Sequence, residues 1–143
     1  MKKIYLILVS VLLLSACTTE IPTSPTHVWG DYSLHLESRP PIIEQGMVEF
    51  LTIVNFEEKL RGWDLIVYYR MGPTGRWVQA IQDGHTGVYR RAMMVNDPET
   101  EVLYVHVKKK QSREQKLKKE EQKETMIKFP LDYSTAAPSK SGS

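Results

Sequence analysis

Histidine and methionine side chains around segment 83–94, DGHTGVYRRAMM, are the residues of this chain that could bind a soft metal ion. Copper(I) prefers thioether and imidazole ligands, so the candidate ligands are Met71, His85, Met93 and Met94. Adjacent strand residues point to opposite faces, and the sequence contains no His-x-Met pair. We therefore predict that the methionines fill the core, and we expect no cofactor; a copper-binding carrier lipoprotein is the alternative.

Catalytic groups do not occur in any recognised arrangement in this sequence. It contains no Gly-x-Ser-x-Gly nucleophile elbow, no glycine-rich phosphate loop and no His-Glu-x-x-His motif. The single cysteine, Cys17, lies in the N-terminal segment, where its neighbours indicate lipid attachment rather than nucleophilic catalysis. The sequence therefore predicts a protein that is not an enzyme.

A basic segment at 108–124, KKKQSREQKLKKEEQKE, could bind an anionic partner. It holds eight basic residues, four acidic residues and one apolar residue, Leu117. Such charge attracts lipid head groups, cell-wall polymers or an acidic protein surface, whereas nucleic acid is not an expected partner outside the cytoplasmic membrane. The plainer interpretation is a solvated extension that its glutamates keep soluble. The candidate contact residues are Lys108, Lys109, Lys110, Arg113, Lys116, Lys118, Lys119 and Lys123.

The N-terminal residues predict a secretory signal that ends in a lipid anchor. Two lysines precede an apolar run at 4–14, which is shorter than the roughly 20 residues that a membrane-spanning helix needs. The following Leu-Ser-Ala-Cys resembles the bacterial lipoprotein box, which implies that residues 1–16 are removed and that Cys17 is lipid-modified. Thr18, in place of the aspartate of retained lipoproteins, implies the outer membrane facing the periplasm, if the source is Gram-negative.

Alternation of apolar and polar residues with a period of two predicts about seven strands. Turn residues separate these strands at intervals of roughly 8–12 residues, which is typical of a β-sandwich, and no amphipathic helix is evident. Trp63 is expected in the core, and Pro130 marks the last strand as an edge strand. The fold class is therefore all-β. The expected strands are 31–38, 46–55, 62–71, 76–82, 88–95, 101–108 and 125–131.

Composition divides the mature chain into a tether, one domain and a tail. Residues 17–30 hold the anchor cysteine and a Ser/Thr/Pro-rich tether, and residues 31–133 form the sandwich, with 108–124 as a charged insert before the last strand. Residues 134–143 are expected to be disordered. Residues 18–107 carry a net charge of −5, whereas residues 108–143 carry +5.

The segment Gly87-Val88-Tyr89, with Asp83 upstream, predicts a structural corner. In immunoglobulin-like sandwiches, a tyrosine at the entry of a late strand hydrogen-bonds to the backbone a few residues upstream. The usual local pattern is an acidic residue followed by Gly-x-Tyr. We therefore expect Tyr89, Gly87 and Asp83 to have a structural role.

Residues 32–107 resemble YtkA-like and FixH-like domains. The resemblance is carried by Gly46, Gly62, Gly87 and Tyr89 within the apolar segments QGMVEFLTIVN, GWDLIVYYRMG and DGHTGVYRRAMMV. Such domains are small immunoglobulin-like β-sandwiches outside the bacterial cytoplasmic membrane, and FixH-like proteins are linked to assembly of metal-containing respiratory oxidases. The resemblance implies a non-catalytic binding or assembly module with an envelope protein partner. Another alternative is a structural lipoprotein that contacts cell wall or anionic lipid through its basic extension.

Overall fold

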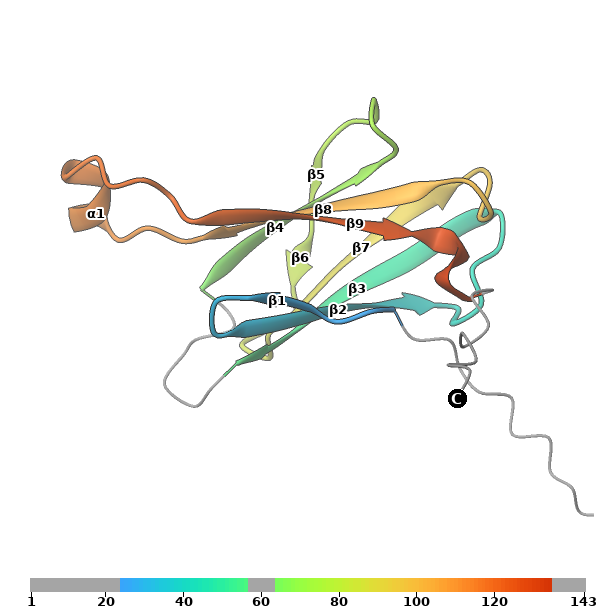
Figure 1. Cartoon of the computed structure of the whole chain (residues 1–143), viewed down its shortest axis with the longest axis horizontal. Coiled ribbons are helices and arrows are strands. Elements are labelled where there is room, and N and C mark those ends of the chain that lie inside the picture. The colour runs from blue at the N-terminus through green and yellow to red at the C-terminus, as the bar shows by residue number, and fades with distance from the viewer. Residues whose placement is uncertain (1–23, 57–63, 135–143) are drawn as a thin grey trace, which may run out of the picture.

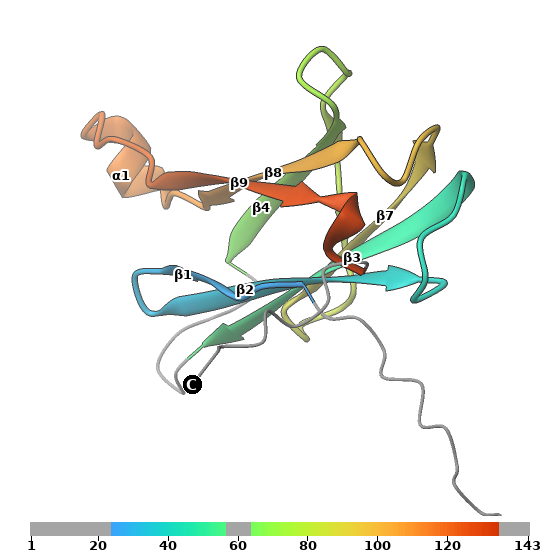
Figure 2. The ribbon, with the colours of Figure 1, turned by 45° about the vertical axis from the view of Figure 1, so that its right-hand side comes forward.

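In the computed structural model, which describes residues 24–56 and 64–134, two antiparallel β-sheets pack face to face (Figures 1 and 2). The expected all-β sandwich is therefore confirmed. The predicted signal peptide, Cys17, Trp63 and nearly all of the predicted tail lie outside the described residues. The strands are β1 (His27–Trp29), β2 (Tyr32–Arg39), β3 (Gly46–Phe56), β4 (Leu65–Met71), β5 (Val78–Gln79), β6 (Ile81–Gln82), β7 (Val88–Val95), β8 (Val102–Lys109) and β9 (Glu124–Pro130).

Strand order gives one sheet of five strands and one of four. The first sheet runs β1-β2-β3-β7-β6 and the second runs β5-β4-β8-β9. Strand β9 is an edge strand, as Pro130 predicted, because proline cannot donate to a further ladder. A short 3-10 helix, η1 (Leu131–Ser134), follows β9.

The core forms because each strand buries every second side chain between the sheets. In β8 the buried residues are Leu103, Val105 and Val107, and their neighbours are partly exposed. The same alternation in the other long strands supplies the rest of the core, including Leu34, Leu36, Val48, Phe50, Val54, Leu65, Val67, Tyr69, Tyr89, Ile127 and Phe129. The period-two alternation expected from the sequence thus corresponds to alternate burial in the sandwich.

One edge of the sandwich is closed by the chain itself. Strand β5 pairs with β4 in the four-stranded sheet, and β6 pairs with β7 in the five-stranded sheet. Between them, buried Ala80 carries the chain across and donates its backbone N–H to Val67. The single strand expected at 76–82 is therefore two short strands, because a continuous strand cannot belong to both sheets.

The domain begins earlier than the predicted boundary at residue 31. The buried hydroxyl of Ser24 donates to the Leu36 carbonyl at 2.8 Å and accepts from the Leu36 N–H at 2.7 Å. Strand β1 then pairs with β2, and His27 Nε2 lies 3.5 Å from Thr125 Oγ1 on β9. Part of the predicted tether is thus an edge strand. The sequence did not predict this strand because it is short and shows no clear alternation of apolar and polar residues.

The basic segment forms an extension between β8 and β9 that projects beyond both sheets (Figure 1). Its helix, α1 (Arg113–Leu117), begins with a capping box in which Ser112 and Gln115 exchange side-chain-to-backbone hydrogen bonds. None of its residues is buried, and Leu117 is exposed. The expected charged extension without an apolar helix face is therefore what the structure contains.

Candidate functional site

Tyr89 lies in the core and joins the two sheets. Its hydroxyl accepts a hydrogen bond of 3.3 Å from the Leu65 N–H on the opposite sheet, and its carbonyl accepts one of 3.0 Å from the Tyr69 hydroxyl. Tyr69 also shares a hydrogen bond of 2.6 Å with Thr52. Burial is the main cause that raises the pKa of Tyr89 to about 12. The Leu65 partner lies 24 residues upstream, not a few residues upstream as expected for a local corner.

Gly87 and Asp83 shape the turn that leads into β7. Gly87 has a φ of +77°, and its carbonyl accepts a hydrogen bond of 2.9 Å from Val54. The backbone of Asp83 donates to Val88 at 2.8 Å, and its carboxylate lies 4.0 Å from Arg90. Both residues therefore position the entry of β7 through backbone contacts.

The candidate metal ligands do not form one cluster. Met93 packs against the core and Met94 is exposed, as expected for neighbours on a strand. Met71 ends β4 and packs against the core, whereas His85 is exposed in the turn between β6 and β7. These two residues lie at opposite ends of the β5–β6 segment. Among residues 24–56 and 64–134, no three His, Cys, Asp or Glu side chains are grouped for a metal ion.

Positive charge in the basic extension is concentrated at its base. Lys108 and Lys109 end β8, and Lys123 precedes β9, whereas segment 111–122 holds four basic and three acidic residues. In this outer part, Lys118 pairs with Glu114 at 2.7 Å. The tip is therefore nearly neutral. Of the eight candidate contact residues, the four at positions 108–110 and 123 carry most of the net charge.

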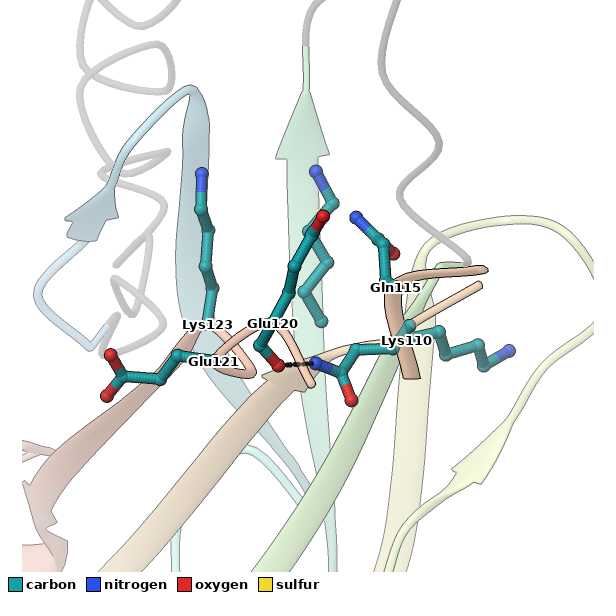
Figure 3. Close-up of a pocket in the computed structure, with 7 residues that line it drawn as sticks. Lys110, Gln115, Glu120, Glu121 and Lys123 are labelled. Atoms are coloured by element: carbon teal, nitrogen blue, oxygen red, sulfur yellow. Dashed lines mark hydrogen bonds between the residues drawn. The ribbon is translucent and has the colours of Figure 1, made fainter. Parts of the chain in front are cut away.

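A small hollow at the base of the extension is formed by the extension itself (Figure 3). Gln111 Nε2 donates a hydrogen bond of 2.7 Å to the Glu120 carbonyl, which closes the hollow. Figure 3 shows Lys110, Glu121 and Lys123 pointing in different directions, so their charges do not converge on a common point. The Gln111–Glu120 hydrogen bond thus joins the two arms of the extension. The hollow beside it does not bring charged groups together in the way that a binding site for a charged ligand would.

A surface that the sequence did not single out lies on the outer face of the four-stranded sheet. We call it the aromatic–cationic face. Its central residue is Arg70, whose Cζ lies 4.4 Å from the Trp77 ring centroid and 4.9 Å from that of Tyr104. Lys128 Nζ lies 5.6 Å from the Tyr104 centroid on the other side. The face consists of Tyr68, Arg70, Trp77, Tyr104, His106, Lys108 and Lys128.

The cations at the centre of this face have no acidic partner within the described residues. Arg70 makes no ion pair there, and its buried Nε atom makes no hydrogen bond within that part of the chain. Lys128 likewise has no carboxylate within 4.0 Å in the described ranges. Two aromatic rings hold the guanidinium in place, so a planar donor group is ready for an anion.

The part of the aromatic–cationic face next to the extension is electrically balanced. Glu124 accepts a hydrogen bond of 3.1 Å from His106 Nε2 if that nitrogen carries the proton, and it lies 4.0 Å from Lys108. Lys108 Nζ lies 5.9 Å from the Tyr68 ring centroid, and the His106 ring lies 5.7 Å from that of Trp77. Unpaired positive charge therefore concentrates around Arg70 and Lys128.

The sequence contained some signals for this face, but they could be interpreted only once the strand register was known. Tyr68 and Arg70 are two positions apart in the strand expected at 62–71, so both must lie on the same side of it, and Trp77 lies in the next expected strand. Only the pairing of β4 with β8 and of β8 with β9 places Tyr104 between Arg70 and Lys128. Their separation in the sequence gives no indication of this contact.

In the segments that the structure describes, no helix is long and apolar enough to cross a membrane. Comparisons with models of known protein families, with curated proteins and with solved structures gave no match.

Proposed function

We propose that this protein is a lipid-anchored, non-catalytic binding module of a bacterial cell envelope, built as an immunoglobulin-like sandwich. The lipoprotein box at 14–17 supports the anchor, and Thr18 supports an outer-membrane location facing the periplasm if the source is Gram-negative. The observation that carries the binding role is Arg70, held between Trp77 and Tyr104 without an acidic partner in the described part of the chain. A cation held by rings and left uncompensated on an open sheet face suits a partner and not a reaction.

A photocrosslinking experiment in cells of the source organism tests this proposal. A photoreactive amino acid replaces Gln79, which is exposed beside Tyr68 on the aromatic–cationic face, or Asn55, which is exposed on the other sheet. We expect membrane-associated adducts from position 79 that Arg70→Ala reduces at least fivefold, and few adducts from position 55. Equal adducts from both positions, or none from position 79, would contradict the proposal.

A further inference from the structure

Four side chains form a row across the four-stranded sheet. The register pairs Arg70 with Tyr104 and Tyr104 with Lys128, and the guanidinium of Arg70 lies over the ring of Trp77 at the β5 edge. Neighbouring strands lie about 4.8 Å apart, so rings and cations alternate along a nearly straight line. A straight row in which rings and cations alternate fits a polymer whose repeating units each carry a similar set of groups.

From this row we infer that the ligand is an acidic polysaccharide, a glycan chain whose sugar rings carry carboxylate or phosphate groups. The inference rests on the proposed function and names the ligand class of the same face. A guanidinium offers two parallel N–H donors that match a carboxylate or phosphate, and the lysine adds a second point charge. The ring edges, and the parts of the ring faces that Arg70 and Lys128 leave uncovered, can contact the C–H groups of sugar rings.

Charge complementarity supports an anionic ligand. Arg70 and Lys128 have no carboxylate partner within the ranges that the structure describes, whereas Glu124 is already engaged by His106 and Lys108. The base of the extension continues the positive surface beyond Lys108. A polyanion that lies along the row contacts Arg70 and Lys128 together, and the positive base of the extension adds to its attraction to this layer, whereas a single small anion would contact one cation.

The distribution of exposed apolar side chains favours a glycan over an acidic protein. The fully buried centre of a protein interface is more apolar than the rest of the surface, and the large apolar side chains exposed in the described segments lie mostly elsewhere. Met126 is the member of that set on this face, at 48% exposure. The others lie on the five-stranded sheet, in a loop or on α1: Val28, Ile42, Met47, Ile81, Met94 and Leu117.

Isothermal titration calorimetry on the full-length chain in a non-ionic detergent tests the ligand class. The probes are polygalacturonate, which carries carboxylates, phosphomannan, which carries phosphates, fully methyl-esterified polygalacturonate, which is neutral, and polyglutamate, which is acidic without sugar rings. We expect one of the first two probes to bind at submillimolar Kd and the neutral polymer to bind at least tenfold more weakly. Polyglutamate should also bind at least tenfold more weakly, and added salt should weaken the binding.

Variants connect this binding to the row. Arg70→Lys should weaken binding of the preferred glycan about tenfold, because lysine keeps the charge but loses the planar fork. Trp77→Ala should weaken it about tenfold as well, because it removes a ring that holds Arg70 in place. Lys128→Ala should weaken binding of the preferred glycan several-fold. Because Lys128 is exposed, this variant tests the row even if circular dichroism shows that another variant does not fold. Arg91→Ala, exposed on β7 of the other sheet, is the matched control and should change nothing.

The outcomes separate the inference from the proposed function. Failure of both acidic glycans, or equal binding of polyglutamate, overturns the glycan inference, and the second result assigns an acidic polypeptide instead. Face-specific crosslinks from position 79 would still support the binding module in either case. Unchanged glycan binding in Lys128→Ala and Trp77→Ala would show that the row is not the site.

Discussion

At the scale of single residues, the buried tyrosines show how polar groups are satisfied between two apolar layers. Tyr69 and Tyr89 each bring a hydroxyl into the core, where an unpaired polar group would cost about 1–3 kcal/mol. The Tyr69 hydroxyl meets Thr52 and the Tyr89 carbonyl, and the Tyr89 hydroxyl meets the Leu65 N–H. These bonds cross the gap between the sheets and so fix their relative position.

Alkaline pH should destabilise the fold through these tyrosines. Burial raises the pKa of Tyr89 from 10.0 to about 12 and raises that of Tyr69 as well. A pKa that is higher in the folded state favours the neutral phenol, so the stabilisation is complete below pH 10 and declines above it. The free energy of unfolding in urea should fall by up to about 1.4 kcal/mol per pH unit for each tyrosine. Tyr89→Phe should flatten this decline between pH 10 and 12, and an unchanged slope would contradict the assignment.

Gly87 should tolerate no side chain. Its φ is +77°, and an added Cβ would lie 2.9 Å from the Val54 carbonyl oxygen. Gly87→Ala should lower the free energy of unfolding by about 1–3 kcal/mol, since strained backbone and close contact act together. Gly84→Ala is the matched control, because Gly84 has a φ of +58° but open space around its Cβ position. A loss at position 84 as large as that at position 87 would show that the contact with Val54 is unimportant.

At the scale of elements, the tip of the extension is energetically separate from the sandwich, whereas its base is not. The helix α1 is held by its own capping box, and its residues bury nothing against the sheets. At the base, Lys110 N–H donates to the Asp64 carbonyl at 2.8 Å, and Gln122 donates to Lys109. The base therefore belongs to the sheet, whereas the tip does not.

Removal of the tip should leave the sandwich intact. Replacement of residues 111–121 by Asn-Gly would join Lys110 to Gln122 in a two-residue turn that suits a hairpin. We expect the midpoint of thermal unfolding to change by no more than a few degrees, because no buried contact is lost. Differential scanning calorimetry measures this change. Loss of cooperative unfolding would show that the tip contributes to the fold.

At the scale of the whole molecule, the charge asymmetry of the chain becomes an asymmetry between layers. The basic residues 108–110, 123 and 128 all belong to the β8–β9 hairpin and its extension, hence to the four-stranded sheet. Arg70 adds to the same layer. A polyanion would thus meet one face of the sandwich in preference to the other.

The anchor should decide where the whole molecule is found. Cys17→Ala removes the thiol that the lipoprotein box offers for acylation, so the chain should incorporate no labelled palmitate. It should also keep the apolar run at 4–14, because the same box directs the removal of residues 1–16. Fractionation with immunoblotting and incorporation of labelled palmitate would measure the change. Ser15→Ala keeps small residues before the cysteine and is the control that should stay in the membrane. Incorporation of labelled palmitate in Cys17→Ala at the level of the unchanged chain would contradict lipid attachment at Cys17.

The sequence by itself determined where the long strands lie and that each buries every second side chain, but it missed β1 and the division of 76–82 into β5 and β6. Period-two alternation between turn residues located β7 to the residue, and the buried residues of β8, Leu103, Val105 and Val107, follow the same alternation. Pro130 also indicated that β9 is an edge strand, and the composition of residues 108–124 indicated an extension without an apolar face. These features depend on local geometry, which side-chain type and spacing control directly.

Only the tertiary structure decided which distant residues meet. The passage of the chain at Ala80 from one sheet to the other, the Tyr89–Leu65 hydrogen bond and the row from Trp77 to Lys128 all depend on strand order and register. Strand order results from the packing of two whole sheets, and the same alternating pattern is compatible with many orders. The aromatic–cationic face therefore became visible only once the sheets were assembled.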